Sequence, residues 1–184
     1  MLTLEKGRPA STDGRQEKEI AVYDFLDKLS VSYERVDHEP AFTMEACEEI
    51  DALLSPAAHC KNLFLCNAQK TDFYLLMIRA DKKFRTKEIS SQIGSSRLSF
   101  GPEEYLLEFL NITPGAVSVM GLMNDKAHRV RLLIDRDLLA QDAVGVHPCV
   151  NTASLRISVS DLTEKFLPAV DHGFLPVVLT ADTI

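Results

Sequence analysis

The feature that most limits how this chain can fold is a pair of apolar stretches, residues 60–66 and 73–78, joined by six mostly polar residues. Each stretch has the length of one strand and carries apolar side chains at both alternating sets of positions, a pattern typical of a strand covered on both faces. The short polar link predicts an antiparallel hairpin in which Cys66 lies opposite Phe73. We therefore expect this hairpin to form the centre of a sheet.

The same register places Lys61 opposite Ile78, at the end of the hairpin where a basic segment, residues 79–87, begins. Alternation along the strand puts Lys61 on one face and Asn62 on the other. A lysine in such a strand either extends past the sheet to water or meets a partner that compensates its desolvation, and the strand alone leaves both readings open. The basic segment has five basic residues and one acidic residue, and its position beside Lys61 favours a binding surface.

Composition excludes several classes of protein. The chain has 184 residues, of which 46% are hydrophobic and 26% charged, values typical of a single globular domain. No apolar run approaches the roughly 20 residues that span a bilayer, and the first residues lack the order of a signal peptide, so we expect a cytoplasmic protein with no membrane partner. The net charge of −7 argues against a general nucleic-acid coat protein and against DNA as a partner, but it leaves room for a local basic surface.

The rest of the chain mixes helical and extended patterns. We expect helices over residues 17–29, 43–50 (with Thr43 as N-cap), 87–93, 103–110 and 160–167, and a short helix or turn over residues 135–140. Further strands are expected over residues 31–36, 116–120, 130–134 and 153–159. Because hairpins are interspersed with helices, we predict a single α+β domain with a mixed, mostly antiparallel central sheet flanked by helices. We place this domain at residues 17–170, after a flexible N-terminal tail (1–16) and before a C-terminal extension (171–184).

Known motifs for metals, nucleotides and nucleophiles are missing from the sequence. The histidines and cysteines lack zinc-ligand spacing, and neither a phosphate-binding glycine motif nor a G-x-S-x-G elbow occurs; we expect no metal and no cofactor. His147 and Cys149 point in opposite directions on an extended segment, which argues against a catalytic dyad. His147 lies in a polar loop where it is either structural or functional, and Gly121 marks either a turn or a close approach to a ligand.

Six segments, in order, resemble one family. They are His38-Glu39-Pro40, residues 60–65, Leu98-Ser99-Phe100-Gly101, residues 114–118, residues 121–125 and residues 147–151. Together they resemble the free-standing prolyl-tRNA editing proteins, the YbaK-like relatives of the editing insertion in bacterial prolyl-tRNA synthetases, over residues 17–167. The resemblance implies a hydrolase that deacylates mischarged tRNA, with alanine on the proline tRNA as the first expectation and cysteine or serine esters as alternatives.

Such an enzyme answers a physical need. A synthetase pocket built for a larger amino acid cannot strongly reject a smaller one, because a missing methylene changes binding by only about 1–3 kcal/mol. A second site that admits alanine and excludes proline by size supplies the remaining discrimination. The resemblance implies that a water attacks the ester with help from the terminal ribose hydroxyl, without a metal or a covalent nucleophile.

The resemblance also implies roles for individual residues. Lys61 matches the family's signature lysine, which would hold the terminal adenosine or its phosphate and orient the ester, and Asn62 would bind the same end. Gly121 and Leu122 map to a backbone-lined site where N–H groups would stabilise a developing oxyanion. His147 would line the aminoacyl pocket.

Further residues complete the predicted site. Ser118 and Asn151 lie in matching segments and are expected to contact the substrate, whereas Lys82, Lys83 and Arg85 are expected to bind tRNA. The implied partners are the acceptor end of a mischarged tRNA and, as a second candidate, prolyl-tRNA synthetase. A module that binds tRNA or a synthetase without catalysis is the alternative from another functional class.

Overall fold

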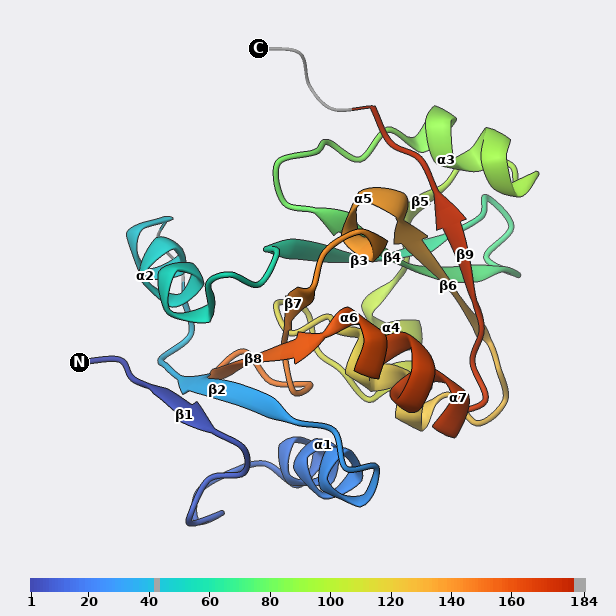
Figure 1. Cartoon of the computed structure of the whole chain (residues 1–184). Helices are drawn as coiled ribbons and strands as arrows, with labels where there is room; N and C mark the ends of the chain where they lie inside the picture. Colours follow the sequence, from blue (N-terminus) through green and yellow to red (C-terminus); the bar gives the residue numbers. More distant parts are fainter. Residues whose placement is uncertain (42–43, 181–184) are drawn as a thin grey trace.

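Two β-sheets pack around one main core in the computed structural model, which describes residues 1–41 and 44–180 (Figure 1). The five-stranded sheet has the order β5 (Ser99–Phe100), β3 (Cys60–Cys66), β4 (Phe73–Arg79), β6 (Val130–Asp135), β9 (Phe174–Val177). The four-stranded sheet has the order β1 (Leu4–Lys6), β2 (Tyr33–Asp37), β8 (Ala153–Ser158), β7 (Ala143–Val146). The longer helices are α1 (Glu17–Lys28), α2 (Met44–Leu54), α3 (Thr86–Ile93) and α4 (Glu103–Leu110). The shorter ones are the 3-10 helix η1 (Val119–Asn124), α5 (Arg136–Leu139) and the closing run α6 (Val159–Asp161), η2 (Leu162–Phe166) and α7 (Leu167–Ala169).

The central hairpin forms in the predicted register. Cys66 lies opposite Phe73 and Lys61 lies opposite Ile78 in the antiparallel pair of β3 and β4. β6 pairs with β4 in parallel and β9 pairs with β6 in parallel, whereas every pair in the four-stranded sheet is antiparallel. The predicted α+β class with mixed, mostly antiparallel strands is confirmed, although the strands form two sheets instead of one.

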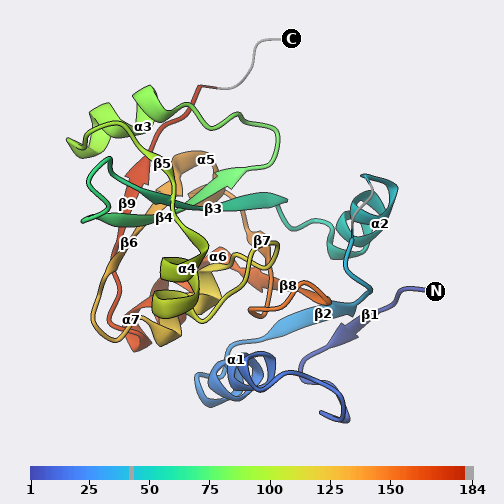
Figure 2. The same ribbon diagram turned by 180° about the vertical axis from the view of Figure 1, so that it is seen from behind.

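β3 separates two apolar clusters, which explains why it is apolar on both faces. Phe64 and Cys66 face the main core, together with α1, α4, the closing helices and the inner face of the four-stranded sheet. Leu63 and Leu65 face a second cluster beneath α3. The view from behind shows α3 and α4 on opposite sides of the five-stranded sheet (Figure 2).

Two strands, Leu4–Lys6 and Phe174–Val177, lie outside the domain predicted over residues 17–170 and yet belong to the sheets. The predicted tail contains β1, whose Glu5 carboxylate pairs with the guanidinium of Arg35, a side chain only 1% exposed. The predicted extension contains β9, which completes the sheet beside β6 and is followed by the buried Leu179. A buried arginine requires a carboxylate partner, and here the N-terminal segment supplies one.

Local structure differs from expectation between residues 114 and 124. The strand predicted over residues 116–120 is wrong: Ser118 caps the 3-10 helix η1 by accepting the N–H of Met120 at 3.2 Å. Residues 143–146, for which no strand was predicted, form β7. The N-cap predicted at Thr43 lies outside the described residues. Within the described ranges, no helix combines the length and apolar character that crossing a bilayer requires.

Candidate active site

A cavity of about 220 Å³ lies between α2 and the loops that flank β8. Its walls comprise His38, Ala41, Cys47, Ile50, Asp51, His59, Gly115, His147, Asn151 and Ser154. A recess of about 60 Å³ continues from it toward β3 and adds Leu54, Cys60, Asn62, Gly145 and Val146. Four residues line both spaces, namely Asp51, His59, His147 and Ser154. The two spaces therefore form one site with a wider and a narrower part.

The hydrogen bonds of His147 fix which ring nitrogen carries the proton. Nδ1 lies 2.9 Å from the carbonyl oxygen of Ala153, and because a carbonyl only accepts, Nδ1 must be the donor. Burial lowers the pKa of His147 below its usual value; His38 and His59 act in the same direction, and the bond to Ala153 opposes them. The ring is therefore neutral near pH 7, and its Nε2 is a hydrogen-bond acceptor.

His38 and Ser154 extend this network. Nδ1 of His38 donates to the carbonyl oxygen of Glu39 at 2.8 Å, so its Nε2 accepts the Ser154 hydroxyl at 2.9 Å. The Ser154 oxygen lies 3.5 Å from Nδ1 of His147, and the two imidazole rings are 6.4 Å apart. The sequence did not assign a role to either residue, although His38 belongs to the His-Glu-Pro segment that carried the resemblance.

A contact between a histidine and an aspartate lies where the two spaces meet. Nδ1 of His59 lies 2.7 Å from Oδ1 of Asp51, which projects from α2. Donation from Nδ1 to this carboxylate leaves Nε2 of His59 as the acceptor when the ring is neutral. No role was predicted for either residue from the sequence, because their contact joins α2 to the segment that precedes β3.

Asn62 carries a buried acceptor without a partner. Its Nδ2 contacts the Sγ atom of Cys60 at 3.7 Å, but its Oδ1 is buried and, among the described residues, has no hydrogen-bond partner. Leaving such an atom unsatisfied costs about 1–3 kcal/mol, so Oδ1 is suited to accept a donor from a ligand in the recess. Asn151 lines the wider part of the cavity beside Gly115. The structure thus brings three predicted residues together here: Asn62, His147 and Asn151.

Comparison with known proteins agrees with this geometry. The profile of the aminoacyl-tRNA editing domain matches residues 38–165, a range that contains every polar residue of the network above. The chain belongs to the aminoacyl-tRNA editing domain family. The resemblance inferred from the sequence, and with it the editing hydrolase class, is confirmed at the level of the family.

Individual editing relatives cover nearly the whole chain. The chain is 36% identical to the prolyl-tRNA editing protein ProX of Acetoanaerobium sticklandii over 86% of its own length and 96% of that protein. It is 29% identical to the prolyl-tRNA synthetase associated domain-containing protein 1 of Mus musculus, over 85% of the chain and 92% of that protein. A crystal structure described as a candidate trans-editing enzyme for prolyl-tRNA synthetase shares the fold, with a TM-score of 0.65 at 16% identity over 90% of this chain and 99% of that one.

Two predicted site residues of the editing domain lie away from the cavity. Gly121 and Leu122 are buried in η1, and the N–H of Gly121 donates to the carbonyl oxygen of Ser118 at 3.1 Å. A Cβ atom at Gly121 would lie 2.5 Å from Cδ1 of Ile112 and 3.2 Å from the backbone oxygen of Leu110, so close packing favours glycine here. Because the N–H of Gly121 already has an internal acceptor, it is not a free donor for the predicted oxyanion role.

Ser118 supports the site from behind. Its side chain is fully buried, and its hydroxyl donates to the carbonyl oxygen of His147 at 2.5 Å. The predicted substrate contact at Ser118 is therefore wrong in this structure, and the residue instead positions the loop that carries His147.

The three cations predicted to bind tRNA fall into two environments. Lys82 is only 3% exposed, and its Nζ lies 2.9 Å from Oδ1 of Asp135 and 2.7 Å from Oδ2 of Asp137. Its charge is paired inside the fold, which favours a structural role over the predicted contact with tRNA. Lys83 and Arg85 are exposed on the surface and stay as tRNA-binding predictions.

Lys61 lies on the opposite face of β3 from Asn62, as alternation predicted. Its Nζ donates to the carbonyl oxygen of Lys82 at 2.6 Å, and it does not line the cavity or the recess. The editing domain thus presents its signature lysine and asparagine on two sides of one strand.

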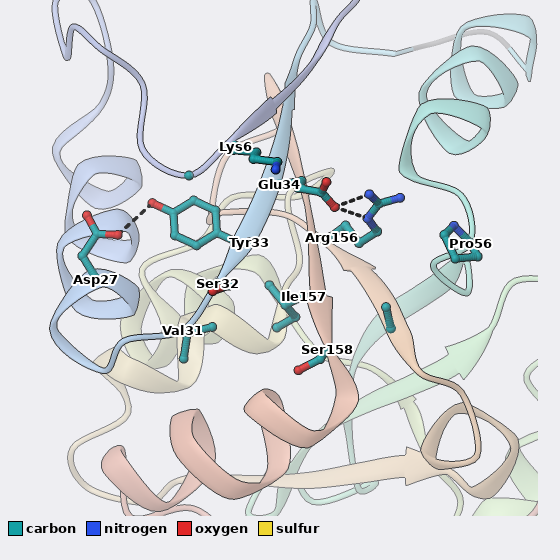
Figure 3. A pocket seen from close by; sticks show the side chains of 12 residues that line it. Lys6, Asp27, Val31, Ser32, Tyr33, Glu34, Pro56, Arg156, Ile157 and Ser158 are labelled. Carbon is teal, nitrogen blue, oxygen red and sulfur yellow. Dashed lines mark hydrogen bonds and ion pairs between the residues drawn. The ribbon is translucent and has the colours of Figure 1, made fainter.

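A larger groove of about 700 Å³ crosses the four-stranded sheet (Figure 3). Two contacts join residues that line it: Arg156 pairs with Glu34, and the Tyr33 hydroxyl donates to Asp27 at 3.4 Å (Figure 3). None of the predicted site residues lines it. The functional argument therefore rests on the smaller cavity.

Proposed function

We propose that this protein is a trans-editing deacylase that hydrolyses alanine from mischarged proline tRNA in the cytoplasm. The observation that carries the proposal is the pairing of two acceptors at one narrow recess, Oδ1 of Asn62 and Nε2 of His147. The name of the ProX relative, a prolyl-tRNA editing protein, supports the choice of tRNA.

The two acceptors suit the α-ammonium group, which distinguishes an aminoacyl ester from other esters. An α-ammonium group presents three N–H donors and no acceptor, as a lysine head does. A neutral His147 and the amide oxygen of Asn62 can each accept one of these donors, and the carboxylate of Asp51, which lines the same recess, favours the positive charge. The lowered pKa of His147 keeps its ring in the accepting form.

The recess also supports a small amino acid. Its volume is about 60 Å³, and Leu54, Cys60 and Val146 form part of its wall. An alanine methyl group needs little of this space, whereas the proline ring adds bulk that a close-packed wall resists. Size exclusion of this kind is what a second editing site must supply.

Water is the proposed nucleophile. Burial raises the pKa of Cys60 to about 12, so the one thiol in the recess is protonated at neutral pH and is a poor nucleophile. The terminal ribose hydroxyl of the tRNA assists the water, as the resemblance implies. Lys61, Lys83 and Arg85 then contact the tRNA, and prolyl-tRNA synthetase is the proposed source of the mischarged substrate.

The test is a deacylation assay with proline tRNA charged with alanine, cysteine, serine or proline. We expect release of alanine to be fastest and proline to be retained. Asn62→Ala and Lys61→Ala should each reduce alanine release by at least about 100-fold, as expected when a positioning contact is lost. Lys126→Ala, at an exposed site, is the matched control. A wild-type protein that binds tRNA but releases none of the four amino acids would show a binding module instead.

A further inference from the structure

Phe100 is an exposed aromatic side chain at the edge of the five-stranded sheet. It is 66% exposed, and among the large apolar side chains exposed in the described ranges it is the single aromatic one. Its ring packs against Phe84, with the ring centroids 6.1 Å apart and the planes at 57°. An aromatic ring held in place while much of its surface meets water is a feature of binding surfaces.

Hydrogen bonds between Thr86 and Leu98 join the two segments that carry Phe84 and Phe100. The Thr86 hydroxyl donates to the carbonyl oxygen of Leu98 at 2.8 Å and accepts its N–H at 3.0 Å. Residues 84–87 and 97–100 therefore lie next to each other. The same two segments carry the exposed cations Lys87 and Arg97.

The two cations line a hollow of about 550 Å³ that contains no acidic side chain. Its other lining residues are Thr86, Ser90, Ser91 and Ser95. Among the described residues, neither Lys87 nor Arg97 has a carboxylate within ion-pair distance. In a chain with a net charge of −7, two unpaired cations beside several hydroxyl groups favour a phosphate ligand.

The ring also shares a sheet face with Lys61. Phe100 lies opposite Leu65 in the pair of β3 and β5, so its side chain projects to the same face as Leu65, Leu63 and Lys61. Lys61 lies four residues from Leu65, or roughly 13 Å along the strand at about 3.3 Å per residue. A chain of nucleotides that passes Phe100 can therefore reach Lys61.

We propose that Phe100, Lys87 and Arg97 form an RNA-binding surface for the unpaired 3′-terminal nucleotides of the tRNA. One base stacks on Phe100, Lys87 and Arg97 bind phosphates in the hollow, and the strand continues toward Lys61. Stacking on an aromatic ring accepts any base, and cations beside the ring bind the backbone. This inference rests on the proposed function, because it names how the same substrate is held.

Binding of an uncharged acceptor-stem minihelix, with or without its single-stranded 3′ end, tests the proposal. We expect Phe100→Leu to weaken binding of the tailed RNA by about 5- to 150-fold, the range for loss of one stacked base, and to leave the blunt RNA unaffected. Phe100→Tyr should stay within about 2-fold of wild type, because the ring is kept. Leu175→Ala, on β9 at the other edge and 46% exposed, is the control for loss of exposed apolar surface.

The salt dependence tests the cations separately. Joint substitution Lys87→Ala and Arg97→Ala should reduce the slope of log affinity against log salt by about 1.4, since each phosphate contact on a single strand contributes about 0.7. An unchanged slope, or tailed-RNA binding by Phe100→Leu equal to wild type, would overturn the proposal. Loss of binding to purified prolyl-tRNA synthetase with unchanged RNA affinity would also overturn it and identify a protein-docking surface.

Hydrolysis of alanyl-adenosine separates this proposal from the function on which it rests. This ester lacks the upstream nucleotides, so Phe100→Leu should hydrolyse it at the wild-type rate while its KM for alanyl-tRNA rises and kcat is kept. Equal losses on both substrates would overturn the surface, because the substitution would then act on the chemistry. A wild-type protein inactive on both substrates would refute the deacylase function, whereas the RNA-binding comparison would still decide the surface.

Discussion

Replacing Lys82 with Met tests whether this lysine serves the fold or the tRNA. Lys82 and Asp135 are 3% and 0% exposed, and their charged atoms lie 2.9 Å apart. Removing one member of a buried ion pair typically costs about 3–5 kcal/mol, because the other charge is left without compensation. Asp135 keeps the N–H of Asp137 at 3.2 Å and that of Arg79 at 3.4 Å, so we expect the lower end, about 3 kcal/mol.

Urea unfolding followed by circular dichroism measures this loss. A change of about 3 kcal/mol is roughly a 150-fold change in the unfolding equilibrium constant. Adding Asp135→Asn to Lys82→Met should recover part of the stability, since it removes the uncompensated buried charge. Lys83→Met, at the exposed neighbouring position, should change the free energy of unfolding by less than about 0.5 kcal/mol.

The result that would refute this reasoning is specific. The free energy of unfolding of Lys82→Met could lie within about 0.5 kcal/mol of the wild-type value while the variant binds tRNA more weakly. The lysine would then act on the ligand, and its ion pair with Asp135 would not stabilise the fold. If the variant loses about 3 kcal/mol of stability while its folded fraction binds tRNA with unchanged affinity, the structural role is supported.

Two further predictions concern His147 and Gly121. Because burial holds the pKa of His147 below its usual 6.5, the unfolded chain takes up a proton that the folded chain does not as the pH falls below 6.5, so stability should decrease there and be fully present at pH 7. The deacylation rate of the wild type should fall at acidic pH with an apparent pKa below 6.5, and this fall should be absent in His147→Gln. An apparent pKa above 6.5 would show that the ring is not desolvated. Gly121→Ala should cost about 1–3 kcal/mol in the free energy of unfolding, because its Cβ would lie 2.5 Å from Ile112. Retained stability with a reduced kcat would instead restore the oxyanion role of Gly121.

The central hairpin was predictable because local and global preferences agree there. Residues 73–78 are buried on both faces, so a shift of register by one residue would still bury apolar groups, but it would move Lys61 and Asn62 to the wrong faces. The short link between the strands then selects one pairing. The helix that ends at Gly94, where φ is +65°, was predictable for a similarly local reason.

Other features depend on partners far away in the sequence. β1 is three residues long, and its place is set by the pairing of Glu5 with Arg35, thirty positions later. Lys82 looked like part of a basic surface because its partner Asp135 lies 53 positions away. No local pattern distinguishes a lysine with such a partner from a solvated one.

Only part of the candidate site was predictable, because some of its contacts also join residues that are far apart in the sequence. Asn62 and His147 were found by resemblance, and the structure places both at one recess. The hydrogen bond from Ser154 to His38 joins residues 116 positions apart, so only the folded chain could reveal it. The internal hydrogen bonds of Gly121 and Ser118 could not be predicted, because a motif shows which residues recur and not which way their polar groups point.

The outer strands of the five-stranded sheet limit how this protein can aggregate. β5 has only two residues, and β9 contains Pro176, which has no N–H to donate. Neither edge therefore offers a long row of free backbone groups on which another chain could add a strand. The edge at Phe100 can thus leave an aromatic ring open to solvent without becoming a template for sheet extension between molecules.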